Sequence, residues 1–333
     1  MKRVFRKAIA FLSAVAVAAT MAVSASAVSA ATRIVKDGEY KQVIVMASET
    51  GIFFTNFSKS EIESKTSDKT VLCVTPDGKK KKVKIKNSAD VSWCSSATSR
   101  SVFTYGSAWM ELHYSDNSRT GYIFTTGKSL ILSGSQGIAY NADGYNGYIY
   151  SRNTAASAFK VYNDKGEKSA TIPYSSLKGA DADLIEEYEL GSYDSDSKAA
   201  LFCGYDSKTD KQKYWLVVNN KTVRTFSVDS ADLIRDKNGS CAVHTCAYDA
   251  KGNMKEAYYS VSTGKVISDF EGGDYSGLSR YSIRQNGSKY SIRKDGREIY
   301  SIEKKNAAGY YAYADSVAIV TKSGSKYGLI MVK

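Results

Sequence analysis

Residues 287–300 read Gly-Ser-Lys-Tyr-Ser-Ile-Arg-Lys-Asp-Gly-Arg-Glu-Ile-Tyr, which is the pattern of two short strands joined by a tight turn at Asp295-Gly296. Residues 324–333 at the end of the chain repeat the first half of this pattern, as Gly-Ser-Lys-Tyr-Gly-Leu-Ile-Met-Val-Lys. Residues 34–44 repeat the second half, including the Lys-Asp-Gly turn. The sequence therefore predicts that a strand near the N-terminus completes the last sheet of the chain.

Turns of this kind recur along the whole chain in two sets. The first set is centred on residues 64, 117, 153, 208, 251, 287 and 324, with a mean spacing of about 43 residues. The second set follows one strand later, at Asp77-Gly78, Thr126-Gly127, Lys165-Gly166, Asn219-Asn220, Thr263-Gly264 and Asp295-Gly296. Because the second set has one member fewer, the last repeat lacks one strand.

A repeat of ~40–45 residues with four strands is the size of a propeller blade. The sequence predicts an all-β chain that forms a seven-bladed β-propeller, closed by an N-terminal strand that completes the last blade and removes two open sheet edges. Six blades, eight blades or an open array of sandwiches are the alternatives. They stay open because the repeat around Asp194-Ser195-Asp196 is long and the strand near residues 274–278 is weak.

Residues 1–30 are predicted to be a secretory signal peptide, which leaves residues 31–333 as a single propeller domain. A basic segment precedes the apolar residues 8–23, and small-x-small patterns end at Ala27 and Ala30. A membrane anchor is the alternative, but the apolar stretch is shorter than the ~20 residues that a spanning helix needs. We expect the mature chain to begin near Val28 or Ala31 and to be extracellular, free or associated with the cell wall, with no transmembrane segment.

Charge and cysteine content restrict the class of protein only loosely. The net charge of +12 falls to +8 without the predicted signal peptide, which carries four basic residues and no acid. A basic secreted protein can be held by teichoic acids, acidic polysaccharides or nucleic acid, although a solvated basic surface is the simpler interpretation.

The cysteines are odd in number and include no Cys-x-x-Cys, so we expect buried free thiols, with one or two disulfides as the alternative. These cysteines are Cys73, Cys94, Cys203, Cys241 and Cys246.

The pattern resembles the broad group of bacterial secreted β-propellers with degenerate blades. Lys326-Tyr327-Gly328-Leu329-Ile330, with its Gly-Ser lead, resembles a tryptophan–glycine repeat in which Tyr replaces Trp. The tryptophan–aspartate signature is absent from every predicted blade. The Asp box of sialidases is absent too, since Asn163-Asp164-Lys165-Gly166 approaches it without its Ser and Trp. The resemblance therefore implies a fold and assigns no catalytic residue.

The sequence predicts no catalytic residue, no metal ligand and no cofactor, since Gly-x-Ser-x-Gly, His-x-His and His-Glu-x-x-His motifs are absent. His113 and His244 are interpreted as structural. Cys246 shares a strand face with His244, but neighbours on one strand seldom form a nucleophile–base pair, so core packing is the interpretation. The acidic residues between Asp181 and Asp196 match no calcium-binding loop and are interpreted as solvated charge.

A run of six lysines in residues 79–86 suggests a polyanion-binding patch on an outer strand. The predicted patch consists of Lys79, Lys80, Lys82, Lys84 and Lys86, while Val83 and Ile85 give the strand an apolar face. Lysines on an outermost strand also prevent edge-to-edge aggregation, and this structural interpretation is the simpler one. Charge is the one feature that points to nucleic acid, so no specific nucleic-acid partner is predicted.

Loops from the outer strand of one blade to the inner strand of the next are predicted to meet at one face of the propeller. They contain Trp93, Tyr174, Asp274 and Tyr275, and aromatic rings at such a face can stack on sugars or pack on a protein. We therefore expect a secreted, monomeric binding or scaffold propeller that engages a glycan, a cell-surface polymer or a protein. The alternatives are an extracellular glycoside hydrolase or lyase on the same fold, and retention at the cell wall by charge alone.

Overall fold

The computed structural model describes residues 31–40, 45–48, 50–55, 69–85, 89–92, 103–105, 109–114, 119–144, 146–181, 183–206, 211–236, 238–268, 270 and 280–333. Within these ranges the regular structure is β-strand and short 3-10 helix, with no α-helix, so the predicted all-β class is confirmed. No helix in these ranges has the length and apolar character needed to cross a membrane. The predicted signal peptide, residues 1–30, lies outside the described residues.

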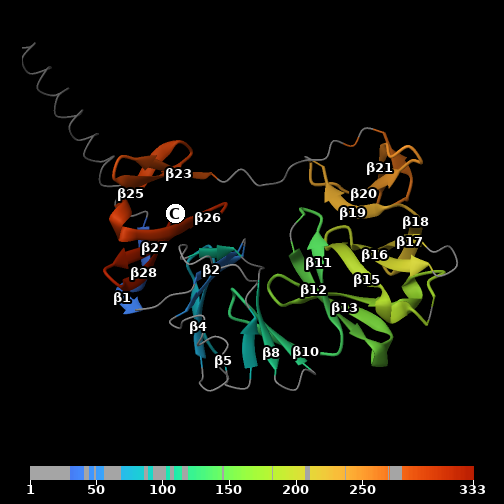
Figure 1. Cartoon of the computed structure of the whole chain (residues 1–333), viewed down its shortest axis with the longest axis horizontal. Helices are drawn as coiled ribbons and strands as arrows, with labels where there is room; N and C mark the ends of the chain where they lie inside the picture. The colour runs from blue at the N-terminus through green and yellow to red at the C-terminus, as the bar shows by residue number, and fades with distance from the viewer. Residues whose placement is uncertain are drawn as a thin grey trace, which may run out of the picture.

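The strands form mainly antiparallel sheets in which most neighbours along the chain are also neighbours in space (Figure 1). One sheet contains β2 (Val45–Ser48), β3 (Gly51–Thr55), β4 (Lys69–Val74) and β5 (Lys80–Ile85), with β7 (Phe103–Tyr105) parallel to β2. The next contains β6 (Ala89–Ser92), β8 (Trp109–Tyr114), β9 (Arg119–Phe124) and β10 (Ser129–Ser133).

An eight-stranded sheet follows, built from two four-stranded halves whose first strands pair in parallel. The first half contains β11 (Gln136–Asn141), β12 (Asn146–Asn153), β13 (Ala158–Asn163) and β14 (Lys168–Pro173). The second half contains β15 (Glu189–Asp194), β16 (Ala199–Asp206), β17 (Lys211–Val218) and β18 (Lys221–Phe226).

Three further sheets complete the chain. The first contains β19 (Ser230–Arg235), β20 (Cys241–Tyr248), β21 (Met254–Ser260) and β22 (Val266–Ile267). The second contains β23 (Tyr281–Asn286), β24 (Lys289–Lys294) and β25 (Arg297–Glu303). The third contains β26 (Ala307–Ala312), β27 (Val317–Ser323), β28 (Lys326–Val332) and, beside β28, the N-terminal strand β1 (Ala31–Tyr40).

The pairing of β1 with β28 confirms the predicted contact between the two ends of the chain. Ala31 lies opposite Val332 and Val35 opposite Leu329. The predicted turn at residues 36–38 is wrong, because these residues lie within β1, where the register against β28 shifts between Val35 and Tyr40. The physical reason is that the extra residues of β1 between Val35 and Tyr40 are taken up as an irregularity in the pairing with β28, so the strand continues without a turn.

Consecutive sheets pack face to face through apolar clusters. Phe54 and Leu72 pack with Val320 and Met331, which joins the sheet β2–β5 to the sheet that holds both ends of the chain. A second cluster joins the two halves of the eight-stranded sheet, and the rings of Phe159 and Phe202 lie 4.7 Å apart in it. Burying a side chain of this size stabilises the fold by ~2–3 kcal/mol. The sheets that share these clusters therefore depend on each other for their cores.

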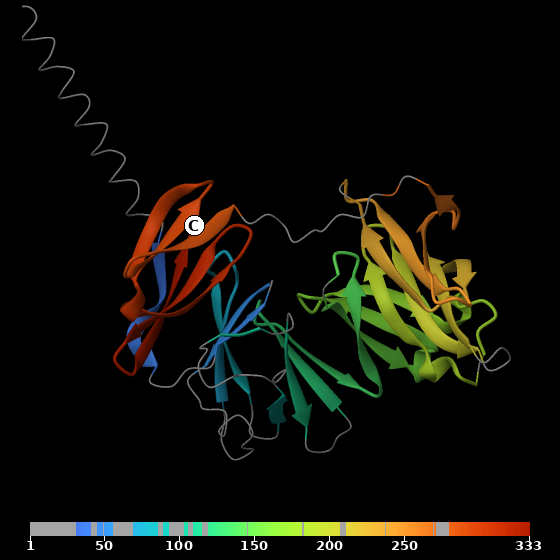
Figure 2. The same cartoon turned by 45° about the horizontal axis from the view of Figure 1, so that its top comes forward.

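The sheets follow one another along an arc (Figures 1 and 2). Successive antiparallel sheets of four strands that pack on each other's faces are the blades of a β-propeller. The sheets β19–β22 and β23–β25 stand at the two facing ends of the arc in both views. The blade count of seven and the closure of the ring stay predictions.

Candidate functional site

A candidate site is a pocket lined by turns from several sheets. Its lining comes from the turns between β2 and β3, β4 and β5, β9 and β10, and β13 and β14. In an up-and-down sheet the first and third turns lie at the same end, so these turns meet on one face of the arc. The pocket has a volume of about 760 Å³ and is lined by Thr50, Thr75, Pro76, Asp77, Lys79, Lys80, Lys81, Thr125, Thr126 and Lys165.

The turn from Thr75 to Lys79 forms one wall of the pocket. The backbone amide of Gly78 donates to the Thr75 carbonyl at 2.8 Å, and the Thr75 amide donates to the Lys79 carbonyl at 3.0 Å. The last sheet fixes this turn from behind, because the Ser316 hydroxyl donates to the Pro76 carbonyl at 2.6 Å. Lys333 Nζ also donates to a turn carbonyl, that of Asp77. The turn is thus held by its own hydrogen bonds and by the C-terminal sheet.

Four lysines line the pocket, and each has an exposed side chain. Lys79 Nζ lies 2.8 Å from the Asp77 carboxylate, and Lys80 Nζ donates to the Ile34 carbonyl at 3.2 Å. The stem of Lys81 lies against Gly127 in the next sheet. Lys165 comes from the β13–β14 turn, two sheets away from Lys80. Since one acid accompanies the four lysines, the lining carries a net positive charge.

Asp77 is the carboxylate of this lining. Hydrogen bonds from Lys79 and Thr75 hold the pKa of Asp77 at about 2, below its ordinary value of 3.8. The same contact with Asp77 raises the pKa of Lys79. Asp77 is therefore ionised at neutral pH and already bound by its neighbours, so it cannot serve as a general acid there.

The floor of the pocket carries hydroxyl groups. Thr125 is buried, and its hydroxyl donates to the Thr50 carbonyl at 2.7 Å across the boundary between two sheets. Lys128 Nζ lies 2.7 Å from Glu167 and links the β9–β10 turn to the β13–β14 turn. Ammonium and hydroxyl groups around one hollow suit an anionic ligand, because both donate hydrogen bonds to phosphate or carboxylate oxygens.

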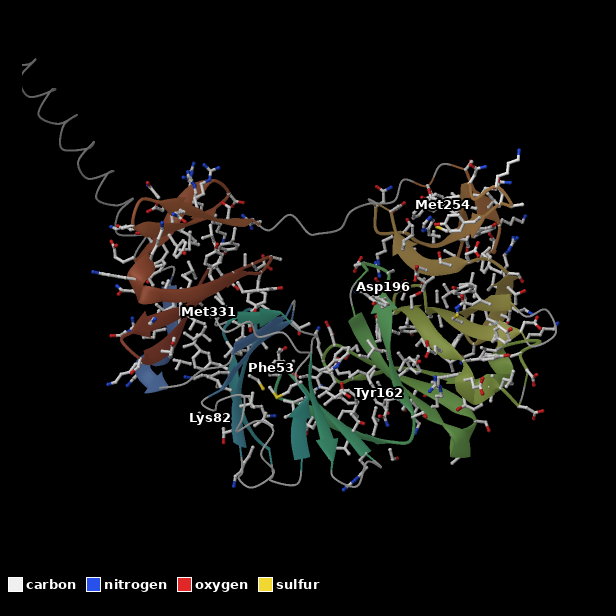
Figure 3. The ribbon with its side chains drawn as sticks, in the orientation of Figure 1. Phe53, Lys82, Tyr162, Asp196, Met254 and Met331 are labelled. Atoms are coloured by element: carbon white, nitrogen blue, oxygen red, sulfur yellow. The ribbon has the colours of Figure 1, made fainter. Side chains whose placement is uncertain are left out.

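The predicted polyanion patch is divided by the structure. Lys79 and Lys80 line the pocket, while Lys82 and Lys84 continue along β5 with exposed side chains. Figure 3 labels Lys82 on this strand. Lys80, Lys82 and Lys84 lie at alternate positions of β5 and so share one face of it. Lys86 lies outside the described residues.

The sequence did not predict the contributions of Lys81, Lys165 and the threonines. Lys81 lies on the same strand face as Val83, which was interpreted as apolar. Lys165 is about 80 residues away along the chain, so its approach depends on the packing of the sheets. A usable signal was present nonetheless, because Thr126-Gly127 and Lys165-Gly166 both belong to the aligned second set of turns.

Tyr174 is the one described member of the predicted ligand-binding set. Its ring packs 4.9 Å from the ring of Phe159 against the core of the eight-stranded sheet, and its hydroxyl oxygen is buried. This position favours a structural role, and contact with a ligand stays a prediction. Trp93, Asp274 and Tyr275 lie outside the described residues.

The four cysteines that the structure describes are free thiols, and Cys73 is the fully buried one. Burial raises the pKa of Cys73 and of Cys241 to about 12 in each case.

The interpretation of His244 and Cys246 as core residues is wrong, since both are partly exposed and they lie beside Glu256 rather than in the core. The side chain of His113 and all of Cys94 lie outside the described part of the chain.

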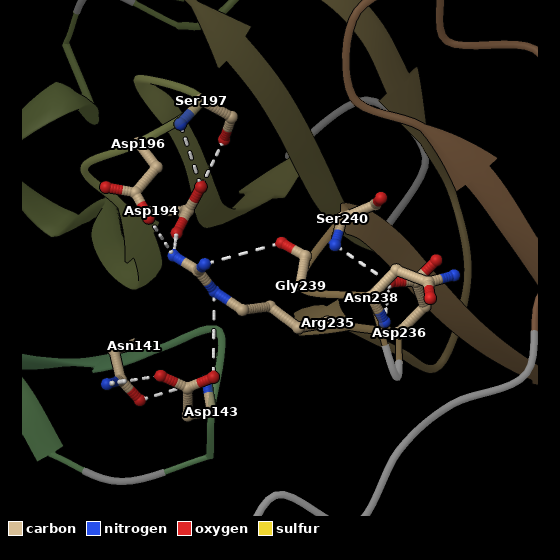
Figure 4. Close-up of polar contacts among 10 residues, drawn as sticks. All are labelled: Asn141, Asp143, Asp194, Asp196, Ser197, Arg235, Asp236, Asn238, Gly239 and Ser240. Atoms are coloured by element: carbon tan, nitrogen blue, oxygen red, sulfur yellow. Dashed lines mark hydrogen bonds and ion pairs between the residues drawn. The ribbon is translucent and has the colours of Figure 1, made fainter.

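Two of the clustered acids contact an arginine (Figure 4), and the interpretation as solvated charge is wrong for Asp194, whose side chain is 3% exposed, but holds for Asp196, whose side chain is 75% exposed. Arg235 on β19 contacts Asp194 and lies 2.8 Å from Asp196, both in the β15–β16 turn region. Asp143, in the β11–β12 turn, lies 3.6 Å from the same guanidinium. Burial lowers the pKa of Arg235, but the three acids together raise it above its ordinary value. Arg235 therefore stays charged and links three groups of strands.

No protein-family model matches this chain, and no curated protein matches its sequence. Among solved structures it is similar to the β-propeller domain of the trilobed protease from Pyrococcus furiosus, with a TM-score of 0.34 and 10% identity over 90% of this chain and 96% of that chain. It is also similar to the WD40 domain of Toxoplasma gondii coronin, with a TM-score of 0.29 and 8% identity over 91% and 84% of the two chains.

A third similar structure is a catalytically inactive virginiamycin B lyase from Staphylococcus aureus with quinupristin. Its TM-score is 0.29 and its identity 11%, over 91% of this chain and 100% of that chain. At these scores the three likenesses carry no argument about function, and the fold description rests on strand order and packing. The resemblance to tryptophan–glycine repeats stays an expectation.

Proposed function

We propose that this protein is a secreted β-propeller that binds an anionic polymer, either an acidic polysaccharide or a phosphate-bearing cell-wall polymer. One observation carries the proposal: four lysines, from the β4–β5 and β13–β14 regions, line a single pocket that contains one carboxylate. Lysine ammonium groups are compact charges that bind phosphate and carboxylate oxygens. The pocket volume of about 760 Å³ lies in the usual range for ligand sites.

A polymer fits this surface better than a small ion does. Lys82 and Lys84 extend the positive charge along β5 from Lys80. A chain with repeated negative charges can occupy the pocket and follow this strand at the same time. Repeated contacts of one polymer raise its overall affinity without any single strong contact.

The alternative of a polysaccharide-degrading enzyme receives no support from this pocket. Glycoside hydrolysis generally uses a pair of carboxyl groups that flank the scissile bond. The described lining holds the single carboxylate of Asp77, whose pKa of about 2 keeps it ionised and paired. The arrangement therefore favours binding over turnover.

The test is a binding assay with the mature chain, residues 31–333, against poly(glycerol phosphate) teichoic acid and polygalacturonate, with dextran as the neutral reference. A triple variant with Lys80→Met, Lys81→Met and Lys165→Met removes three charges and keeps the aliphatic stems. Exposed ion pairs contribute about 0.2–1 kcal/mol each, so the loss of three should lower the affinity for at least one polymer by about 3- to 150-fold. The same samples are assayed for released sugar, and we expect none.

A control variant with Lys251→Met, Lys255→Met and Lys265→Met lowers the net charge equally on exposed lysines in and around β21. We expect this control to keep at least half of the affinity at moderate salt. An equal loss in both variants would show that charge alone holds the polymer, and the pocket proposal would be wrong. Sugar release that the pocket variant abolishes would favour the enzyme.

We further propose that seven blades close into a ring and that the protein is exported. The pairing of β1 with β28 and the regular spacing of the turns support the ring. A compact chain of this length has a radius of gyration of roughly 19 Å, which small-angle scattering measures directly, and a clearly larger value would contradict closure. N-terminal sequencing of protein from the culture medium should begin near Val28 or Ala31.

A further inference from the structure

His244, Cys246 and Glu256 bring three metal-binding atoms together on the sheet β19–β22. His244 Nε2 lies 3.2 Å from Glu256 Oε1 and 3.6 Å from Cys246 Sγ. Cys246 Sγ lies 3.8 Å from the same carboxylate oxygen. The three atoms thus form a small triangle of one nitrogen, one sulfur and one oxygen.

Strand register explains why these side chains meet. His244 and Cys246 are two apart on β20 and so lie on one face of the sheet. Glu256 on β21 is the direct cross-strand partner of Cys246. The neighbouring residue Val243 faces the other way, into the cluster shared with β15–β18. The triangle therefore lies on the face of this sheet that points away from the preceding sheet.

The shape of the triangle matches three corners of a zinc tetrahedron. Zinc binds sulfur at ~2.3 Å and nitrogen or oxygen at ~2.0–2.1 Å, with tetrahedral angles between the bonds. This geometry separates the nitrogen and sulfur ligand atoms by about 3.5 Å, nitrogen and oxygen by about 3.3 Å, and sulfur and oxygen by about 3.5 Å. The observed separations of 3.6, 3.2 and 3.8 Å lie within about 0.3 Å of these values. A single ion can therefore reach all three atoms with small side-chain shifts.

The same geometry argues against a cysteine nucleophile with a histidine base. In such a triad the cysteine and the acid contact different nitrogens of the imidazole ring. Here Cys246 Sγ and Glu256 Oε1 both lie beside Nε2 of His244. Convergence on one point is the requirement of a metal ion, and it leaves no path for proton transfer from the thiol through the ring to the acid.

The surroundings hold the imidazole ring in place. Tyr258 stacks on His244 with ring centroids 4.9 Å apart and an angle of 20° between the planes. Phe270 stacks on the far side of Tyr258 at 5.0 Å. Asp232 on β19 is the cross-strand partner of His244, so a carboxylate lies on the other side of the ring. Aromatic packing and a neighbouring carboxylate commonly fix the orientation of a ligating histidine.

We propose that His244, Cys246 and Glu256 bind a zinc ion and leave its fourth coordination position open to water or an anion. A set that includes a thiolate and an imidazole selects zinc over calcium and magnesium, which prefer oxygen ligands. Half of the Glu256 side chain is covered and the His244 side chain is 23% exposed, so the ion can enter from solvent. This site is separate from the lysine-lined pocket, and its test does not depend on polymer binding.

The test is a titration of the full mature chain with zinc chloride by calorimetry, under a non-thiol reductant, followed by cobalt chloride as a spectroscopic substitute. We expect one zinc ion per chain and a thiolate-to-cobalt charge-transfer band. Cys246→Ser should weaken zinc at least about 100-fold and abolish that band, since loss of a direct ligand exceeds the 10–100-fold cost of losing an outer partner. Glu256→Gln should weaken zinc and keep the band.

Cys203→Ser is the matched control, because Cys203 is another partly exposed free thiol, on β16. It should leave zinc affinity and the cobalt band unchanged. A second readout needs no variant: zinc should slow the alkylation of Cys246 by iodoacetamide, mapped by mass spectrometry, and leave Cys203 unaffected. Unchanged affinity in Cys246→Ser, an equal loss in Cys203→Ser, or alkylation of Cys246 at the same rate with zinc would overturn the proposal.

Discussion

Gly166 lies so close to Phe124 that a Cβ atom at residue 166 would stand 2.4 Å from a carbon of the Phe124 ring. Gly166 belongs to the turn between β13 and β14, and Phe124 is the last residue of β9. The contact therefore joins two consecutive sheets, and it explains why this turn carries glycine. Gly78, Gly127 and Gly264 of the second set of turns likewise lie against the sheet before their own, whereas Gly296 of that set has no described atom within 4 Å of an added Cβ.

Gly166→Ala should destabilise the protein for two reasons. The residue has a φ of +73°, which costs ~1–2 kcal/mol for a residue with a Cβ, and overpacking against Phe124 adds ~1–3 kcal/mol. Gly144→Ala is the control, since Gly144 has a φ of +84° with no described atom within 4 Å of its added Cβ. Urea unfolding should show a larger loss for Gly166→Ala, and equal losses would contradict the packing role.

The stability of the fold should fall at alkaline pH because of Cys73. Burial raises the pKa of this thiol from 9.0 to about 12, so between these values the folded chain keeps a proton that the unfolded chain has released. The contribution is fully present below pH 9.0 and is lost as the pH rises toward 12, at up to about 1.4 kcal/mol per pH unit. Between about pH 8 and pH 10.5, wild type should lose ~2 kcal/mol more than Cys73→Ala does. Equal losses would show that Cys73 does not titrate across this range.

The sheets could be predicted from the sequence because their signals are local. Alternation of apolar and polar residues over five or six positions, and a turn after each run, define a hairpin such as β23 and β24 without reference to the rest of the chain. The match between residues 287–300 and the two chain ends even predicted the pairing of β1 with β28. The exact register of β1 could not be predicted, because no turn connects the two strands.

The candidate sites were harder to predict because they depend on contacts between strands and sheets. Lys165 reaches the pocket of Lys80 through the packing of separate sheets, and nothing local signals that approach. The cluster of His244 and Cys246 with Glu256 had a usable signal. The turn at Asp249 closes with a hydrogen bond to Asn253, which sets Tyr248 opposite Met254 and hence Cys246 opposite Glu256.

Tyr174→Ala should lower stability without a selective effect on polymer binding. The ring packs against Phe159 at the edge of the core of the eight-stranded sheet. Truncation of a fully buried aromatic ring costs ~3–5 kcal/mol, and because Tyr174 is partly buried we expect about 2–3 kcal/mol. Tyr174→Phe keeps the ring and removes the buried hydroxyl, so it should retain most of the stability that Tyr174→Ala loses. Thermal unfolding measures both. A folded Tyr174→Phe variant that loses glycan binding would instead support the ligand role that the sequence predicted.

Arg235→Met should destabilise the protein strongly, because it leaves acids without their counter-charge. The Asp194 side chain is 3% exposed. Besides Arg235, it is contacted by Ser197, whose backbone amide donates to Asp194 Oδ2 at 2.9 Å. Removing one member of a buried ion pair costs ~3–5 kcal/mol. Since the Arg235 side chain is 20% exposed and Asp196 is largely solvated, we expect about 2–4 kcal/mol here.

A double-mutant cycle separates the ion pair from the loss of side-chain packing. Asp194→Asn in the same background removes the buried charge, so Arg235→Met should then cost less by about 1–3 kcal/mol, measured by urea unfolding. Arg235→Lys should fall between wild type and Arg235→Met, because an ammonium group keeps the charge and cannot contact Asp194, Asp196 and Asp143 together. If Arg235→Met costs the same with and without Asp194→Asn, the buried charge is not what Arg235 stabilises. The link between the three groups of strands would then rest on apolar packing alone.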